Sequence, residues 1–90
     1  MTAINNTEDI TSRTLILYST SACHLCETAL ALIAPQLDSL VITLEEVDIS
    51  ESDALMARYG IRIPVLKFAA GKEELGWPFS EEQSLEFARL

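Results

Sequence analysis

The chain has 90 residues, of which 49% are hydrophobic and only three each are glycine and proline. A chain of this size and composition has one hydrophobic core, which excludes a disordered or low-complexity protein. Fourteen acidic residues against six basic ones give a net charge of −8, which repels phosphate backbones and anionic lipids and argues against nucleic-acid and membrane-surface partners.

The N-terminal segment 1–13 is polar and has neither the basic region nor the apolar run of a secretory signal. We therefore predict a flexible tail over 1–13, a single domain over 14–90, and the cytoplasm as location. Two cysteines are too few for the disulfide framework of a small secreted domain. The cysteine content favours catalysis or metal binding in a reducing compartment.

The first half of the domain predicts a strand, a helix and a second strand. The continuous apolar run over 14–18 is typical of a strand buried on both faces. Strong helix formers follow the cysteines, and Pro35 is expected to end this helix or bend it into an irregular turn over 36–39. The second strand, over 40–49, is expected to be less buried toward its far end. Four residues share one face of the helix: Leu25, Ala29, Leu32 and Ile33.

A short second helix is predicted between the second and third strands. Ser50 or Ser52 can cap its start, and Gly60 occupies the position where a left-handed residue usually stops a helix. One face of this helix carries three hydrophobic residues: Leu55, Met56 and Tyr59.

The remaining residues predict a hairpin and a terminal helix. A strand over 61–68 has Pro64 at its entrance, where no ladder donor is required. A tight turn over 70–72 leads into a returning strand over 73–77. The segment 80–83 fits a capping box for a helix that runs to the C-terminal residue. The element order is β-α-β-α-β-β-α, which predicts an α/β domain that begins with a parallel βαβ unit.

The segment YSTSACHLCE contains both cysteines, Cys23 and Cys26, and the only histidine, His24. In the first turn of a helix, residues three apart have Cα atoms about 5 to 6 Å apart, which is within reach of a disulfide. The N–H groups and the dipole at the helix start stabilise a thiolate, so we predict a lowered pKa for Cys23. Cys23 would then attack a disulfide and Cys26 would resolve the mixed disulfide. His24 either adds positive charge beside Cys23 or is a solvated spacer.

A cysteine pair of this kind can also belong to a metal site or to a haem attachment site. A structural zinc site takes four ligands, and the chain has one cysteine pair with one histidine inside it. Haem attachment requires histidine directly after the second cysteine, where Glu27 stands. The open alternatives are a zinc or 2Fe–2S site bridged between two chains, a redox-sensing module without turnover, and two buried cysteines that act as small hydrophobic residues.

Residues 14–90 resemble the thioredoxin superfamily, and most closely its small glutaredoxin-like branch. Two segments carry the resemblance: LILYSTSACHLC and, further along, YGIRIPVLKF. It implies a thioredoxin-like fold with a four-stranded mixed sheet in the order 2-1-3-4, two helices on one face and one on the other. It also implies that Pro64 is a cis-proline and that the N–H and C=O groups of Ile63 form a free strand edge for the backbone of a substrate.

The resemblance further implies a monomeric dithiol–disulfide oxidoreductase that binds no cofactor and reduces protein or glutathione mixed disulfides, with glutathione as a possible co-substrate. Three positions depart from the pattern of glutathione-using members: no lysine precedes Cys23, Arg62 stands where threonine is expected, and Trp77 where glycine is expected. Arg62 is then a candidate for tuning the thiolate or for holding a carboxylate of glutathione. Trp77 either lines the substrate groove or joins the core, and the N–H groups near Ser80 are candidates for binding a second carboxylate.

Overall fold

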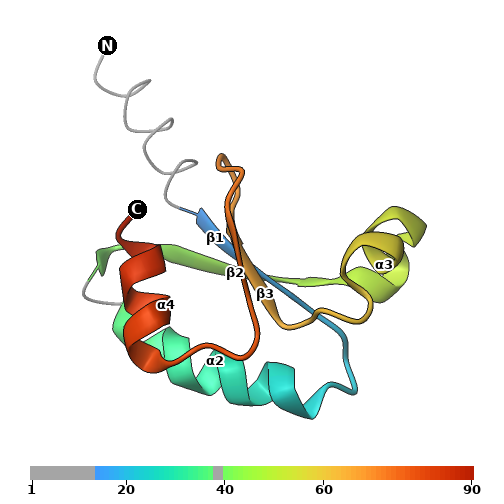
Figure 1. Cartoon of the computed structure of the whole chain (residues 1–90), viewed down its shortest axis with the longest axis horizontal. Coiled ribbons are helices and arrows are strands. Elements are labelled where there is room, and N and C mark those ends of the chain that lie inside the picture. The colour runs from blue at the N-terminus through green and yellow to red at the C-terminus, as the bar shows by residue number, and fades with distance from the viewer. Residues whose placement is uncertain (1–13, 38–39) are drawn as a thin grey trace.

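The computed structural model describes residues 14–37 and 40–90. The predicted tail over 1–13 and the last two residues of the predicted irregular turn lie outside this part of the chain. Four strands form one sheet: β1 (Thr14–Ser19), β2 (Thr43–Asp48), β3 (Val65–Phe68) and β4 (Glu74–Gly76). Their order is β2-β1-β3-β4, with β1 parallel to β2 and antiparallel to β3, and β3 antiparallel to β4 (Figure 1). The predicted sheet is confirmed.

The helices divide between the two faces of the sheet. The long helix α2 (His24–Leu37) and the last helix α4 (Glu81–Ala88) lie side by side on one face (Figure 1). The short helix α3 (Asp53–Tyr59), preceded by the 3-10 turn η2 (Ile49–Glu51), packs on the other. This arrangement follows from alternation along β1, since Leu15 and Leu17 join the cluster formed with α2 and α4, whereas Tyr18 packs beside α3.

The first helix differs from its prediction in two respects. Pro35 lies inside α2, which continues to Leu37. Pro35 removes one helical hydrogen bond, the one to the carbonyl of Ala31, but both residues are exposed, so water can bind that carbonyl. The side-chain amide of Gln36 also donates to the carbonyl of Leu32 at 2.9 Å. Leu25, expected on the buried face, is 48% exposed. The buried face is rotated toward the second cysteine and consists of Cys26, Ala29, Ile33 and Leu37.

The second strand is shorter than predicted, and its burial runs in the opposite direction. Val41 has a positive φ of 55°, which interrupts extended backbone before Thr43. The near end of β2 is exposed, whereas Val47 is half-buried and Ile49, just past the strand, is fully buried. The prediction of a less buried far end is wrong, because α3 covers this end of the sheet and leaves the other end open.

The prediction of a left-handed stop at Gly60 is also wrong. Gly60 has right-handed helical dihedrals, φ −51° and ψ −39°, and its N–H donates to the carbonyl of Met56 at 2.9 Å. Glycine is needed here because of a close approach, since an added Cβ would lie 2.5 Å from that same carbonyl oxygen. On the predicted apolar face of α3, Tyr59 is buried and Leu55 half-buried, but Met56 is 44% exposed.

The last hairpin and helix follow the sequence closely. The turn is centred earlier than predicted, because Gly71 donates its N–H to the carbonyl of Phe68 at 3.1 Å. Ser80 caps α4 as predicted. Its hydroxyl accepts from the N–H of Gln83 at 3.0 Å, and its own N–H donates to the side chain of Gln83 at 2.8 Å. The helix ends at Ala88, two residues before the predicted end.

Candidate active site

Two neighbouring strands deliver the candidate site residues to one end of the sheet. Tyr18 on β1 pairs with Val65 on β3, and the two strands are antiparallel. The chain that leaves β1 therefore departs beside the chain that enters β3. The first leads to Cys23 at the start of α2, and the second is the segment Ile63–Pro64 (Figure 1). The topology thus brings together two motifs that are well separated in the sequence.

Cys23 occupies the capping position of α2. Its carbonyl accepts the first helical hydrogen bond from the N–H of Glu27 at 3.2 Å, and its Sγ accepts from the N–H of Cys26 at 3.1 Å. A side-chain acceptor at this position satisfies an N–H group that the helix itself leaves unpaired. The same donor would stabilise a negative charge on the sulfur if the cysteines were reduced.

The two cysteines form a disulfide, with their Cα atoms 5.2 Å apart. Their exposure differs: Cys23 is half-buried, whereas Cys26 is only 1% exposed and belongs to the buried face of α2. Cys23 is therefore the more accessible residue of the pair. The attacking and resolving roles stay predictions, and in both steps the sulfur of Cys23 is the atom that reacts with the partner.

The segment Ile63–Pro64, which precedes β3, makes backbone hydrogen bonds to the end of α3 and to the chain after β4. The peptide bond between Ile63 and Pro64 is cis, and Pro64 is fully buried. The carbonyl of Pro64 accepts from the N–H of Trp77 at 3.0 Å. The predicted free strand edge at Ile63 needs correction, because its N–H donates to the carbonyl of Tyr59 at 3.1 Å. The turn that ends α3 uses this donor, so the carbonyl of Ile63 is the group that remains a candidate for a substrate backbone.

Trp77 and Ser80 follow β4 on the way to α4. The half-buried ring of Trp77 meets the buried ring of Phe79 edge to face, with centroids 5.0 Å apart. Trp77 thus joins the core on one side and reaches the surface on the other. Both the hydroxyl and the N–H of Ser80 are used in the capping box. The backbone N–H of Ser80 is therefore not free to bind a carboxylate, whereas its hydroxyl accepts from Gln83 and keeps its own hydrogen as a donor. A second cis peptide bond, Trp77–Pro78, was not anticipated from the sequence.

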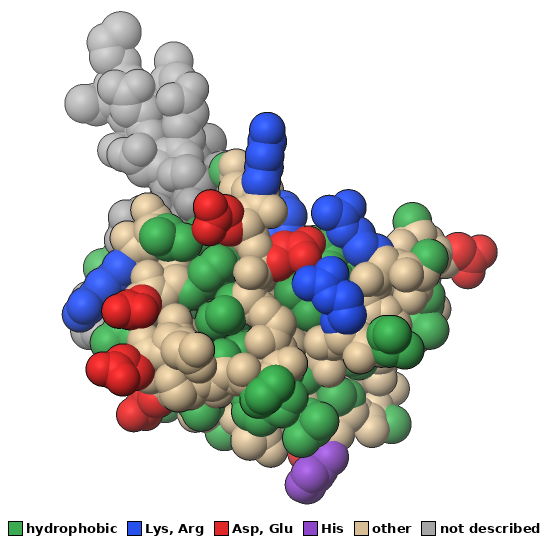
Figure 2. All heavy atoms as spheres, in the orientation of Figure 1, with side chains coloured by type: hydrophobic (Ala, Val, Ile, Leu, Met, Phe, Trp, Pro, Cys, Tyr) green, Lys and Arg blue, Asp and Glu red, His purple; other side chains and the backbone are tan. Residues whose placement is uncertain are grey.

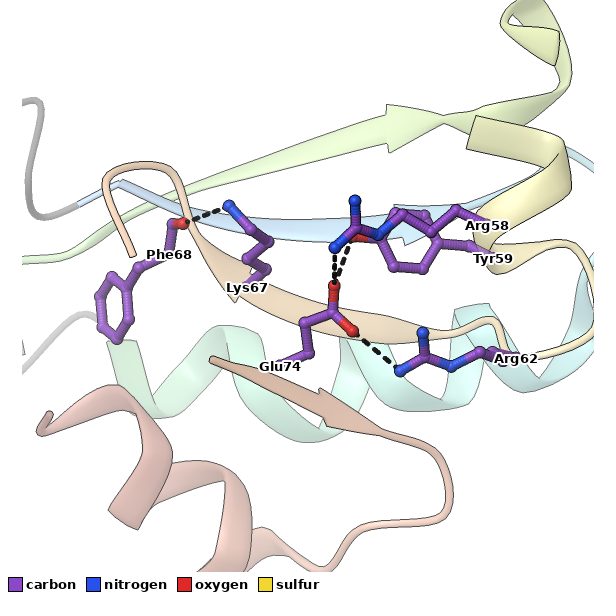
Figure 3. A network of polar contacts seen from close by, with 6 residues as sticks. All are labelled: Arg58, Tyr59, Arg62, Lys67, Phe68 and Glu74. Carbon is purple, nitrogen blue, oxygen red and sulfur yellow. Dashed lines mark hydrogen bonds and ion pairs between the residues drawn. The ribbon is translucent and has the colours of Figure 1, made fainter. Parts of the chain in front are cut away.

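Arg62 takes part in a polar network that the sequence did not reveal (Figure 3). Glu74 on β4 accepts a hydrogen bond from the hydroxyl of Tyr59 at 2.6 Å, pairs with Arg62 at 2.9 Å and lies 3.6 Å from Arg58. Both guanidinium groups also lie over the ring of Tyr59, at 5.6 and 5.5 Å from its centroid. In the structure Arg62 is thus paired with the carboxylate of Glu74. The sequence did not identify Glu74 as part of this network, because only the pairing of β3 with β4 places Glu74 beside α3.

The network shifts the pKa values of Tyr59 and Glu74 in opposite directions. Burial, together with the hydrogen bond to Glu74, raises the pKa of Tyr59 to about 12. The hydrogen bond from Tyr59 and the neighbouring Arg62 lower the pKa of Glu74 below its usual value. Near neutral pH the network therefore contains a neutral phenol, a carboxylate and two guanidinium groups.

His24 is the first residue of α2 and is exposed. Figure 2 shows the histidine projecting from the surface, with hydrophobic side chains gathered next to it. Among residues 14–37 and 40–90, no three or more His, Cys, Asp or Glu side chains come together as a group that could hold a metal ion. Within the same residues no helix has the length and apolar character needed to cross a membrane.

Two hollows lie at opposite ends of the sheet. One, of about 250 Å³, opens beside the chain that leads to Cys23 and is lined by Ser19, Thr20, Ser21, Glu46 and Asp48. The other, of about 640 Å³, is formed by the far end of the hairpin and the end of α4 and includes Phe68, Phe87 and Leu90. The hollow near the cysteines is therefore small and acidic, whereas the larger hollow is remote from them.

The fold and the cysteine pair at the start of α2 define a member of the thioredoxin superfamily. Residues 14–86 match the family described as Glutaredoxin-like domain (DUF836). The chain belongs to this family. Among curated proteins, no significant match to the chain was found.

Solved structures support the same assignment. The X-ray structure of target protein XcR50 from X. campestris is 33% identical and has a TM-score of 0.70, covering 83% of this chain and 95% of that one. The solution structure of the same target gives 33% identity and a TM-score of 0.68, with 83% and 91% coverage. A mutant thioredoxin from Halobacterium salinarum NRC-1 is 20% identical with a TM-score of 0.68, covering 94% of this chain and 81% of that one, which shows the common fold.

Proposed function

We propose that this protein is a dithiol–disulfide oxidoreductase that uses Cys23 and Cys26. The observation that carries the proposal is the position of Cys23 at the start of α2, where its sulfur accepts the N–H of Cys26 at 3.1 Å and bonds to the sulfur of Cys26. The more exposed cysteine thus lies where a thiolate is stabilised, and the sulfur of the buried cysteine lies within bonding reach. The family match adds support.

The reaction consists of two sulfur exchanges. The thiolate of Cys23 attacks one sulfur of a substrate disulfide, forming a mixed disulfide and releasing the other substrate half as a thiolate. Cys26 then loses its proton and attacks the sulfur of Cys23, which forms the internal disulfide and releases the second substrate thiolate. Two electrons pass from the dithiol to the substrate, and the two released thiolates take up protons from solvent. An external dithiol or two glutathione molecules restore the reduced pair.

The surrounding residues have proposed roles in binding and tuning. Ile63, through its carbonyl, and Pro64 would contact the backbone of a substrate beside Cys23, with Trp77 at the border of this surface. His24 would add positive charge near the thiolate when protonated. Ser80 would fix the start of α4, and its hydroxyl hydrogen is the donor that it would offer to a carboxylate.

The substrates are proposed to be protein disulfides or glutathione mixed disulfides, with glutathione as co-substrate and no bound cofactor. We propose that the protein acts as a monomer in the cytoplasm, where a reducing glutathione pool can regenerate the dithiol. The acidic composition makes nucleic acid and anionic membranes unsuitable partners.

A pair of single variants tests the two cysteine roles. Cys26→Ser should accumulate a mixed disulfide with glutathione or a disulfide-containing peptide, because the resolving thiol is gone, and Cys23→Ser should accumulate none. Mass spectrometry of the intact protein measures both. Mixed disulfides of equal abundance in the two variants would contradict the assigned roles.

The thiolate argument has its own test. In the Cys26→Ser variant, alkylation of Cys23 should reach half its maximal rate at a pH below about 8.5, the value for free cysteine. A midpoint at or above that value, with no reduction of either disulfide by the wild-type protein, would refute the proposal. An absorbance spectrum typical of a 2Fe–2S cluster in freshly purified protein would instead support the metal-bridged alternative.

A further inference from the structure

Several basic side chains gather on the face of the molecule that carries β3, β4 and α3 (Figure 2). Arg58 lies in the last turn of α3, Arg62 in the loop before Ile63, and Lys67 on β3. We call Arg58, Arg62 and Lys67 the basic patch. It stands out because the whole chain has six basic residues against fourteen acidic ones.

The basic patch is not neutralised by its own contacts. Arg58 and Arg62 share a single carboxylate, that of Glu74, at 3.6 and 2.9 Å. The ammonium of Lys67 donates to the neutral carbonyl of Phe68 at 3.3 Å. Within the described residues, the ion pairs of the basic patch therefore leave one guanidinium and one ammonium charge without a carboxylate.

The depths of these groups show which charge an approaching molecule meets. The side chains of Arg58 and Arg62 are 64% and 44% exposed, whereas that of Glu74 is only 15% exposed. Glu74 also accepts the hydroxyl of the buried Tyr59. The carboxylate lies between the two guanidinium groups (Figure 3) and is less exposed than either of them. A partner would contact the cations first.

The basic patch borders the proposed site. Arg62 immediately precedes the cis segment Ile63–Pro64, and the strand pairing of Val65 with Tyr18 places that segment at the end of the sheet where the chain leads to Cys23. An extended chain advances about 3.3 to 3.6 Å per residue, and charges interact over about 8 Å at physiological salt. Carboxylates a few residues from a disulfide engaged at Cys23 would therefore come under the influence of the patch.

We propose that the basic patch selects disulfide partners that carry acidic side chains a few residues from the reactive sulfur. This inference rests on the proposed oxidoreductase function and adds a substrate class to it. The net charge of −8 repels acidic partners elsewhere on the surface, so the patch sets the orientation in which such a partner can approach. Glu74 is a positioning residue, since it acts through Arg58 and Arg62.

The test uses three peptides that differ only in charge. Each has a central cysteine, as a mixed disulfide with neutral 2-mercaptoethanol, flanked by glycines and then by two Glu, two Gln or two Lys on either side. Pre-reduced protein is mixed with each peptide under single-turnover conditions, and the second-order rate constant is followed by the fluorescence of Trp77. At about 20 mM salt the Glu peptide should react about three to ten times faster than the Gln peptide, and at about 0.5 M salt the ratio should fall below about two.

Three variants assign the preference to the patch. The double variant Arg58→Gln/Arg62→Gln should bring the Glu to Gln rate ratio close to one. Arg89→Gln, which changes an arginine at the end of α4 in the same way, should keep the wild-type ratio. Glu74→Gln should raise the ratio, because it removes the shared carboxylate. If Glu74 had a merely structural role, its substitution would change all three rates alike.

The outcomes separate this inference from the proposed function. Equal rates for the Glu and Gln peptides, or a faster Lys peptide at low salt, would overturn the inference while leaving the oxidoreductase activity in place. If no peptide is reduced, the proposed function fails, and the patch is then tested by fluorescence anisotropy with labelled peptides in which serine replaces cysteine. Salt-sensitive binding of the Glu peptide that the double variant loses would support the patch, and equal binding of the Glu and Gln peptides would refute it.

Discussion

The hydrogen bond between Tyr59 and Glu74 should contribute strongly to the free energy of unfolding of this protein. Tyr59→Phe removes only the hydroxyl, so the ring keeps its stack on Tyr18, with centroids 4.3 Å apart, and its place beneath the two guanidinium groups. The lost bond is 2.6 Å long, joins a phenol in a 2% exposed residue to a carboxylate, and is thus of the charge-assisted kind. Such bonds contribute about 1.5 to 3 kcal/mol.

Equilibrium unfolding in urea, followed by the fluorescence of Trp77, measures this loss. In a domain of this size, the same loss corresponds to a decrease in Tm of about 4 to 8 °C per kcal/mol. A double-mutant cycle with Glu74→Ala isolates the pair, since Tyr59→Phe should cost less than about 0.5 kcal/mol once its acceptor is gone. A cost of Tyr59→Phe that is equally large with and without Glu74 would show that the stabilisation does not come from this hydrogen bond.

Three further predictions concern stability. Gly60→Ala should destabilise the protein by about 1 to 3 kcal/mol, because the new Cβ would lie 2.5 Å from a carbonyl oxygen, although alanine favours the helical dihedrals of this position. Gly76→Ala is the matched control, since nothing lies within 4 Å of its added Cβ. Urea unfolding of both variants checks this, and a stabilised Gly60→Ala would contradict it. Ser80→Ala should cost about 1 kcal/mol through loss of the cap on α4, visible as a lower urea midpoint, and an unchanged midpoint would show that the cap is dispensable. The free energy of unfolding that comes from the raised pKa of Tyr59 should be fully present below pH 10.0 and lost as the pH rises toward about 12. The part that comes from the lowered pKa of Glu74 should be fully present above pH 4.5 and lost as the pH falls through the folded-state pKa. Unfolding across these pH ranges should show the alkaline loss in wild type and not in Tyr59→Phe, and parallel curves would refute the assignment.

Local sequence signals predicted the elements where the chain's own backbone chemistry decides them. The capping box at Ser80 is satisfied within four residues, and it formed as predicted. The apolar run of β1 and the cysteine pair at the start of α2 are equally local, because a strand, a loop and a helix start follow directly from residue type. Boundaries were less accurate, as at Pro35, because on the exposed side of a helix water can replace the one hydrogen bond that proline removes.

The predictions were wrong where contacts with a neighbouring element decide the burial or hydrogen bonding of a residue. The burial of β2 is reversed because α3 covers the end near Ile49. The N–H of Ile63, expected to be free, is used by the turn that ends α3. Gly60 is needed for contact with a carbonyl and not for a positive φ. None of these contacts follows from residue type alone, since each depends on how α3 is placed against the sheet.

By itself the sequence determined the order of elements, the charge balance and the spacing of Cys23 and Cys26, because these depend on covalent order and local backbone preferences. Only the tertiary structure decided what surrounds them. It buried Cys26 and left Cys23 partly accessible, and it brought Glu74 from β4 to Arg62 and Tyr59. The physical reason is that burial and ion pairing depend on strand register and on the face that each helix covers, and residues distant in the chain meet only when the sheet has formed.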